Sequence, residues 1–149
     1  MKNEFEVEKH NIKNIIIDKK LKEYVENNTN NIDEKLIAEI LTVSSMLKRD
    51  GNIDDVERMI SCFSVSKKLR NLKKLKNFLM KLDFHIYSTY TIKKGLYGLK
   101  FGYLSDTNIE TMVSTMKIIY DICVYFKCKF DGWGTTVENG NANSDSIDQ

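Results

Sequence analysis

The side chains that most often perform catalysis are few in this sequence, and they are not spaced to act together. His10 lies in an irregular amino-terminal stretch and His85 in a predicted strand, and neither is placed to meet a cysteine or a pair of carboxylates. The cysteines Cys62, Cys123 and Cys128 form no Cys-x-x-Cys motif, so a zinc site is not expected. We predict a protein that is not an enzyme and that uses neither a metal nor a cofactor.

The cysteines also indicate a compartment. Their odd number and the lack of a paired framework are typical of a reducing cytoplasm. We therefore predict a cytoplasmic protein in which Cys62 and Cys128, placed on neighbouring strands, are free thiols.

A basic segment is the clearest electrostatic feature. Residues 67–82 predict a helix with leucines along one side and no acidic residue. The side chains that would form a basic docking face are Lys67, Arg70, Lys73, Lys74, Lys76 and Lys81. Such a face could bind phosphates or an acidic protein segment. The alternative, which we favour, is the solvated side of a helix in a lysine-rich protein, because the leucines alone explain the helix.

Aromatic residues alternate along two predicted strands of a hairpin. They are Tyr87, Tyr90, Tyr97, Phe101 and Tyr103. Alternating aromatics on a sheet that packs against helices usually form core contacts and cross-strand pairs. We therefore interpret this group as structural, not as a stacking surface for nucleic acid.

The only tryptophan lies between two glycines, directly after the last predicted strand. Asp131 can turn the chain through bonds from its side chain to the backbone, and Gly132 and Gly134 permit positive φ or a close approach. Trp133 is then either a plug over the core or an exposed anchor for a partner. The glycines favour the plug, because they let the ring fold flat against the sheet, so we predict a mainly structural role.

The hydrophobic pattern predicts the elements that position these residues. Residues 1–31 form an amino-terminal extension with a short helix near 16–26, residues 32–138 form the main domain, and residues 139–149 form a disordered tail. The predicted helices of the domain are 33–49, 67–82 and 107–126, and the predicted strands are 55–65, 84–92, 96–104 and 127–130, the last with a resumption at 135–138.

This order predicts the fold class. After the first long helix it reads β-α-β-β-α-β, which is typical of an α+β protein with a ferredoxin-like sandwich, here preceded by an additional helix. In the usual strand order for that topology, 4-1-3-2, the first strand is central and the last is an edge. Both helices of the repeat would then cover one face of an antiparallel sheet.

Length and composition agree with one globular unit. The chain has 149 residues, of which 42% are hydrophobic, and this is enough to bury the core of a single domain. The net charge of +2 is too small to require nucleic acid or an anionic membrane as the partner. The apolar runs are far shorter than the roughly twenty residues of a spanning helix, so we expect no membrane contact.

One motif carries a family resemblance. The stretch Phe130–Thr135, an aromatic residue followed by Asp-Gly-Trp-Gly-Thr, resembles the signature of the regulator of ribonuclease E activity B family. The resemblance covers residues 33–138 and includes the break at residues 50–52 and the acidic stretch 53–55. It implies a ferredoxin-like protein without cofactors that inhibits an endoribonuclease by binding it. The signature residues, which are also candidate partner contacts, are Asp131, Gly132, Trp133, Gly134 and Thr135.

Three functions are compatible with these features. The first is a non-enzymatic regulator that binds another protein, by resemblance a ribonuclease or a component of RNA degradation. The second is an RNA-binding protein that uses helix 67–82, and the third is an antidote-type protein that neutralises a toxin. Salt separates the first two, because RNA affinity carried by lysines falls steeply as salt rises.

Overall fold

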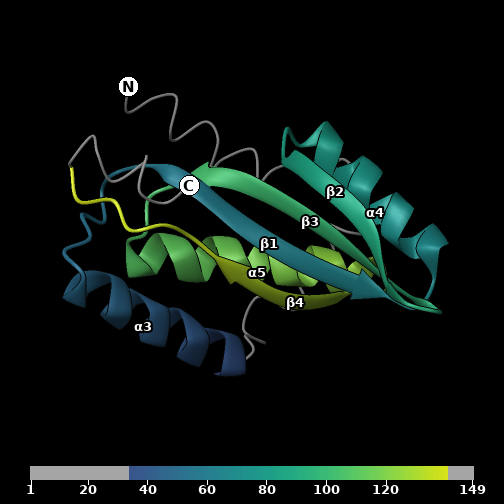
Figure 1. Ribbon diagram of the computed structural model, residues 1–149, viewed down its shortest axis with the longest axis horizontal. Helices are drawn as coiled ribbons and strands as arrows, with labels where there is room; N and C mark the ends of the chain where they lie inside the picture. The colour runs from purple at the N-terminus through teal and green to yellow at the C-terminus, as the bar shows by residue number, and fades with distance from the viewer. Residues whose placement is uncertain (1–33, 141–149) are drawn as a thin grey trace.

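The structure, a computed structural model, describes residues 34–140. This part of the chain forms one four-stranded sheet and three helices. The helices are α3 (Glu34–Arg49), α4 (Leu69–Lys81) and α5 (Ile109–Tyr125), and the strands are β1 (Arg58–Ser66), β2 (His85–Lys93), β3 (Leu96–Ser105) and β4 (Lys129–Gly134). All neighbouring strands are antiparallel, and their order is β2-β3-β1-β4 (Figure 1). The predicted α+β class is therefore confirmed, with the first strand central and the last at an edge.

The observed elements differ from the predicted ones mainly at their ends. The first strand begins at Arg58 and not at residue 55, because residues 54 and 55 form a turn. The last strand continues to Gly134, and residues 135–138 are not a strand. The predicted helix 16–26 and the extension 1–31 lie outside the described residues, as does the predicted tail from residue 141 onward.

The central strand β1 divides its side chains strictly between the two faces of the sheet. Burial alternates along the strand, with the even-numbered residues such as Ile60 and Cys62 fully enclosed. The same face of β3 contributes Leu99 and Phe101. Because successive side chains in a strand point to opposite faces, the odd-numbered residues of β1 lie on the other side.

Two helices cover the core face of the sheet. α4 contributes the fully buried Leu72, Leu75 and Leu79, which recur at helical spacing along one side. α5 contributes Met116 and Ile119 to the same core. In Figure 1, β1 passes in front of α5, so the viewer looks onto the sheet face that these helices leave open.

The additional helix α3 joins the same core through α5. Its buried residues Leu36 and Ile40 belong to the hydrophobic cluster that includes Met116 of α5. Glu34 in its first turn and Arg49 in its last have the charges that favour the two ends of a helix dipole. The helix ends in the break predicted at residues 50–52, where the Asn52 N–H donates to the Leu47 carbonyl at 3.0 Å.

The core contains one polar atom whose removal should stabilise the fold. The Tyr103 hydroxyl is buried and has no hydrogen-bond partner in the part of the chain that the structure describes. Since an unsatisfied buried hydroxyl destabilises a protein by about 1–3 kcal/mol, Tyr103→Phe should raise the free energy of unfolding by about 1 kcal/mol. Urea denaturation of the two proteins measures this, and a clear loss of stability in Tyr103→Phe would contradict the assignment.

Candidate functional site

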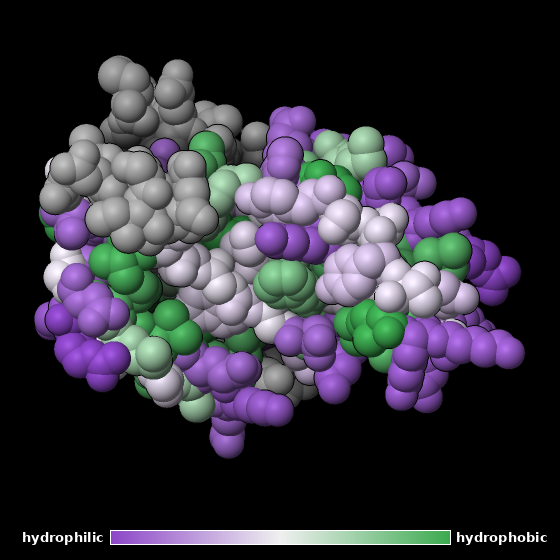
Figure 2. All heavy atoms as spheres, viewed as in Figure 1, coloured by the Kyte–Doolittle hydropathy of each residue, from purple (hydrophilic) through white to green (hydrophobic). Residues whose placement is uncertain are grey.

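The face of the sheet opposite α4 and α5 is the most distinctive surface of the molecule. No helix within residues 34–140 packs on it, and large side chains remain exposed there, among them Tyr87, Tyr90 and Leu104. Figure 2 shows this face, with pale and green residues over much of the sheet, a hydrophilic side chain among them, and further hydrophilic residues around the margin. We call it the open face. An exposed apolar and aromatic surface with a charged rim is typical of a binding site.

The positions of the hairpin aromatics correct the prediction that all of them are structural. Phe101 and Tyr103 are buried in the core, and Tyr97 packs against it, as expected of structural aromatics. Tyr87 and Tyr90, in contrast, lie on the open face, where 40% and 38% of their surfaces are exposed. The hairpin aromatics are therefore two groups on opposite faces of the sheet.

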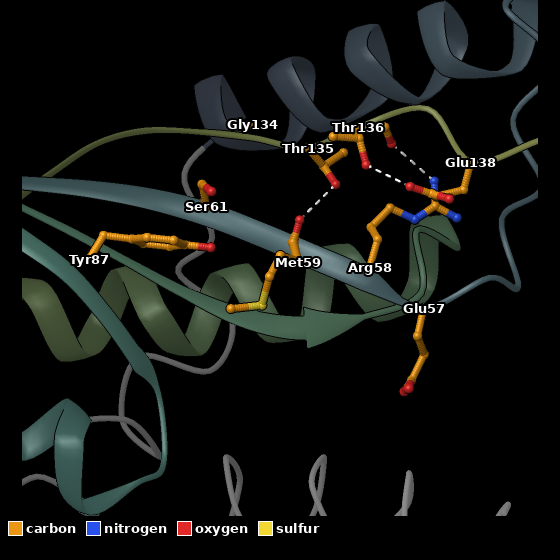
Figure 3. A pocket seen from close by; sticks show the side chains of 9 residues that line it. All are labelled: Glu57, Arg58, Met59, Ser61, Tyr87, Gly134, Thr135, Thr136 and Glu138. Atoms are coloured by element: carbon orange, nitrogen blue, oxygen red, sulfur yellow. Dashed lines mark hydrogen bonds between the residues drawn. The ribbon is translucent and has the colours of Figure 1, made fainter. Parts of the chain in front are cut away.

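A hollow at one end of the open face brings signature residues together with exposed ones (Figure 3). It has a volume of about 520 Å³ and is lined by Glu57, Arg58, Met59, Ser61, Tyr87, Gly134, Thr135, Thr136 and Glu138. In the close-up, the Tyr87 ring lies along the sheet and its hydroxyl points toward Ser61. Gly134 and Thr135, two of the candidate partner contacts, thus line this hollow.

A β-bulge explains how the signature is arranged. β4 pairs with β1 through Phe130↔Ser64 and then Gly132↔Phe63, so Asp131 is the extra residue. Gly132 has φ of 136°, a conformation that residues with a Cβ rarely adopt. After the bulge, Trp133 lies opposite Cys62 and packs, partly buried, against the core. This is the arrangement expected of a plug.

The remaining signature residues attach the end of β4 to the sheet. The Thr135 hydroxyl donates to the Met59 carbonyl at 3.0 Å, a bond drawn in Figure 3. Gly134 pairs with Ser61, and a Cβ built on it would meet no atom within 4 Å. The hollow is therefore open directly above Gly134.

A buried arginine fixes the wall of the hollow. Arg58 is 4% exposed, and its guanidinium donates to the carbonyls of Ile53 and Val56, each at 2.6 Å, and to that of Thr136 at 3.2 Å. It also donates to the Asn52 side chain, whose oxygen accepts the Glu138 N–H at 3.0 Å. Burial lowers the pKa of Arg58, while nearby carboxylates, Glu138 first, oppose this shift. These bonds hold the segment after β4 against the turn before β1.

The candidate basic docking face is divided between two places. Arg70, Lys73, Lys74 and Lys81 are exposed on the outer side of α4, opposite its leucines, and Lys76 is half-buried at the margin. Lys67 lies elsewhere, at the end of β1. There it lines a second hollow of about 420 Å³, formed by Val65, Ser66, Lys67, Lys68, Asn71, Leu96, Lys127 and Lys129.

The three cysteines share the hydrophobic core, whereas His85 lies on β2 beside Tyr87. Cys62, Cys123 and Cys128 are all free and buried. The prediction that Cys62 and Cys128 lie on neighbouring strands is wrong, because Cys128 precedes β4 and Cys62 pairs with Trp133. His85 contacts Tyr87 on β2, and among residues 34–140 no group of three potential metal ligands occurs.

Comparison with known proteins assigns this chain to no family. The sequence matches no model of a protein family and no curated protein. None of the helices within the described range is long and apolar enough to cross a bilayer. The family resemblance in Phe130–Thr135 therefore stays a prediction.

The burial of the thiols predicts slow alkylation. Desolvation raises the pKa of Cys123 to about 12 and that of Cys128 to about 11, and it raises the pKa of Cys62 well above its usual value. Since the thiolate is the reactive form, native protein at pH 8 should resist iodoacetamide, whereas unfolded protein should be labelled at all three positions. Mass spectrometry of the two samples measures this, and rapid labelling of native protein would contradict the burial.

The position of Trp133 predicts a loss of stability on truncation. Because the ring packs against the core but is only partly buried, Trp133→Ala should lower the free energy of unfolding by about 2–3 kcal/mol, less than a fully buried ring. Leu104→Ala, on the open face and 52% exposed, is the control and should change stability little. An unchanged melting curve for Trp133→Ala would show that the ring is not a plug.

Proposed function

We propose that this protein is a non-enzymatic regulator that binds another protein through the hollow on the open face. The observation that carries the proposal is that Gly134 and Thr135, at the end of the signature, line a hollow beside the exposed Tyr87. The resemblance of Phe130–Thr135 to the ribonuclease E regulators favours an endoribonuclease, or another component of RNA degradation, as the partner.

The lining of the hollow indicates what a partner would insert. Met59 and Tyr87 supply apolar walls, and the carboxylates of Glu57 and Glu138 outnumber the one guanidinium of Arg58, which already binds backbone carbonyls. A side chain with an apolar stem and a basic end satisfies both features, because Lys and Arg bury their methylene groups while their charge meets carboxylates. We therefore expect a partner's Lys or Arg to anchor here.

The proposal also includes a more specific fold than the α+β class. We propose a ferredoxin-like sandwich preceded by α3, which is supported by the element order and by the strand order β2-β3-β1-β4. We also propose that the protein acts in the cytoplasm, which is supported by its three free, buried thiols.

Filling the hollow tests the proposed function. Gly134→Trp adds a large side chain where the structure leaves space, so stability should change by less than about 0.5 kcal/mol. Affinity for the partner should fall about 30-fold, the effect of losing a hot spot of roughly 2 kcal/mol. The control is Asn77→Trp, which adds the same side chain at an exposed position of α4.

The measurement compares the three proteins as baits. Each tagged, nuclease-treated protein is incubated with lysate of the native host, and bound proteins are quantified by mass spectrometry. An RNA-degradation component that binds wild type and Asn77→Trp but not Gly134→Trp would support the proposal. A toxin with the same pattern would favour the antidote-type function instead, and equal capture by all three proteins would contradict a role for the hollow.

A further inference from the structure

The other end of the open face has a different chemistry, and we propose that it binds single-stranded RNA. In this proposal the rings of Tyr90 and Phe63 stack on bases, and lysines at the end of β1 hold phosphates. This goes beyond the proposed function, because it is a second activity at residues that do not line the hollow of Figure 3. It also differs from RNA binding by the outer side of α4, because Arg70, Lys73 and Lys74 do not line the second hollow.

Tyr90 offers a flat aromatic surface. A Cβ built on Gly98, its partner in β3, would lie 2.4 Å from Cζ and 2.8 Å from the hydroxyl oxygen of Tyr90. The ring therefore rests directly on the glycine backbone, an approach that any side chain at position 98 would prevent. One side of the ring meets the sheet, and 38% of the residue is exposed to solvent. A base can stack on such a surface whatever its identity.

Lys100 lies between two aromatic rings on the open face, those of Phe63 and Tyr87. Phe63 and Lys100 are paired across β1 and β3, and the Lys100 Nζ is 5.7 Å from the centroid of the Phe63 ring and 4.7 Å from that of Tyr87. Cation–π contact of this kind holds the ammonium group on the face of the sheet. A positive charge between aromatic rings is the combination that binds a nucleotide, with its base on a ring and its phosphate on the cation.

The strand register connects the aromatic surface to the basic hollow. One row across the sheet runs from Tyr90 through Gly98 and Val65 to Lys129. Lys129 lines the hollow of about 420 Å³ with Lys67, Lys68 and Lys127, and none of its described lining residues is acidic. The hollow also includes Asn71 of α4, so it lies at the end of the sheet, beside the open face. The charge of this end is thus complementary to a phosphate backbone that continues beyond the stacked bases.

These observations favour RNA over an acidic protein segment. An acidic peptide could use the lysines, but it gives no reason for a ring laid flat on a glycine with its other side exposed. A duplex keeps its bases stacked inside, where Tyr90 and Phe63 cannot reach them. Single strands with accessible bases are the usual targets of RNA-binding sheets that carry exposed aromatic residues.

Fluorescence anisotropy with a labelled ten-nucleotide RNA of mixed sequence tests the proposal. With about four lysine–phosphate contacts, affinity should fall roughly 50-fold between 50 and 200 mM salt. Tyr90→Leu keeps an apolar cover over Gly98 but removes the ring, so it should weaken binding about 5- to 100-fold, whereas Tyr90→Phe should bind like wild type. Melting curves of all variants show that each one is folded.

Two charge-reversal pairs locate the phosphate contacts. Lys67→Glu/Lys129→Glu should weaken binding and reduce its dependence on salt. Lys73→Glu/Lys74→Glu makes the same change of charge on the exposed outer side of α4 and should leave affinity within about threefold of wild type, since long-range charge effects are screened at 0.15 M salt. An equal loss in both pairs would overturn the proposal, because it would indicate binding by charge alone or by the helix.

Three other results would also overturn the proposal. They are an absence of RNA binding by wild type, an unchanged affinity in folded Tyr90→Leu, and tighter binding of a ten-residue glutamate peptide or of duplex RNA than of the single strand. Gly134→Trp separates this proposal from the proposed function, because it fills the hollow at the opposite end and should leave RNA affinity unchanged.

Discussion

The pairing of β1 with β3 is the interaction on which the rest of the structure depends. It runs without interruption from Arg58↔Ser105 to Ser66↔Tyr97 and sets which side chains face the helices. In this register Ile60 and Cys62 are in the core, and Phe63 is on the open face. A slip of one residue would exchange the two sets, exposing Ile60 and Cys62 and moving Phe63 into the core opposite Leu99 or Phe101. The hydrophobic core and the open face are thus fixed by the same hydrogen bonds.

Two of the three irregularities in the edge strands then reassign aromatic residues between the faces. Without the extra Asp131 in β4, Trp133 would lie opposite Ser61 on the open face, but the bulge places it opposite Cys62 against the core. In β2 the extra residue is Tyr87, and the shift brings Tyr90 opposite Gly98 on the open face. Edge strands can accept these irregularities because only one side of each is paired with a neighbour in the sheet.

The same bulges show what the sequence could and could not predict. The leucines of α4 and the alternation in β1 recur at regular spacing, so their elements and buried sides follow from the pattern. The faces of Tyr87 and Tyr90 do not follow, because a period of two assigns faces correctly only when no residue is inserted. The Asp131-Gly132 pair does signal an irregularity in the sequence, but nothing comparable marks Tyr87. The hollow that contains Gly134 depends on contacts between β1, β2 and the segment after β4, which no local pattern encodes.

The amino-acid composition does not show how charge is distributed over the open face. The net charge of +2 is the sum over a chain with nearly equal numbers of acidic and basic residues, so it indicates no preferred partner. The fold separates them in part. Glu57 and Glu138 outnumber Arg58 in the hollow at one end of the sheet, and Lys67 and Lys129 line the hollow at the other end, where no described lining residue is acidic. A field with opposite signs at its two ends orients a charged molecule even when the total charge is small. For both proposed binding sites, the local charge at the two ends of β1 therefore matters more than the number of charges that the chain carries.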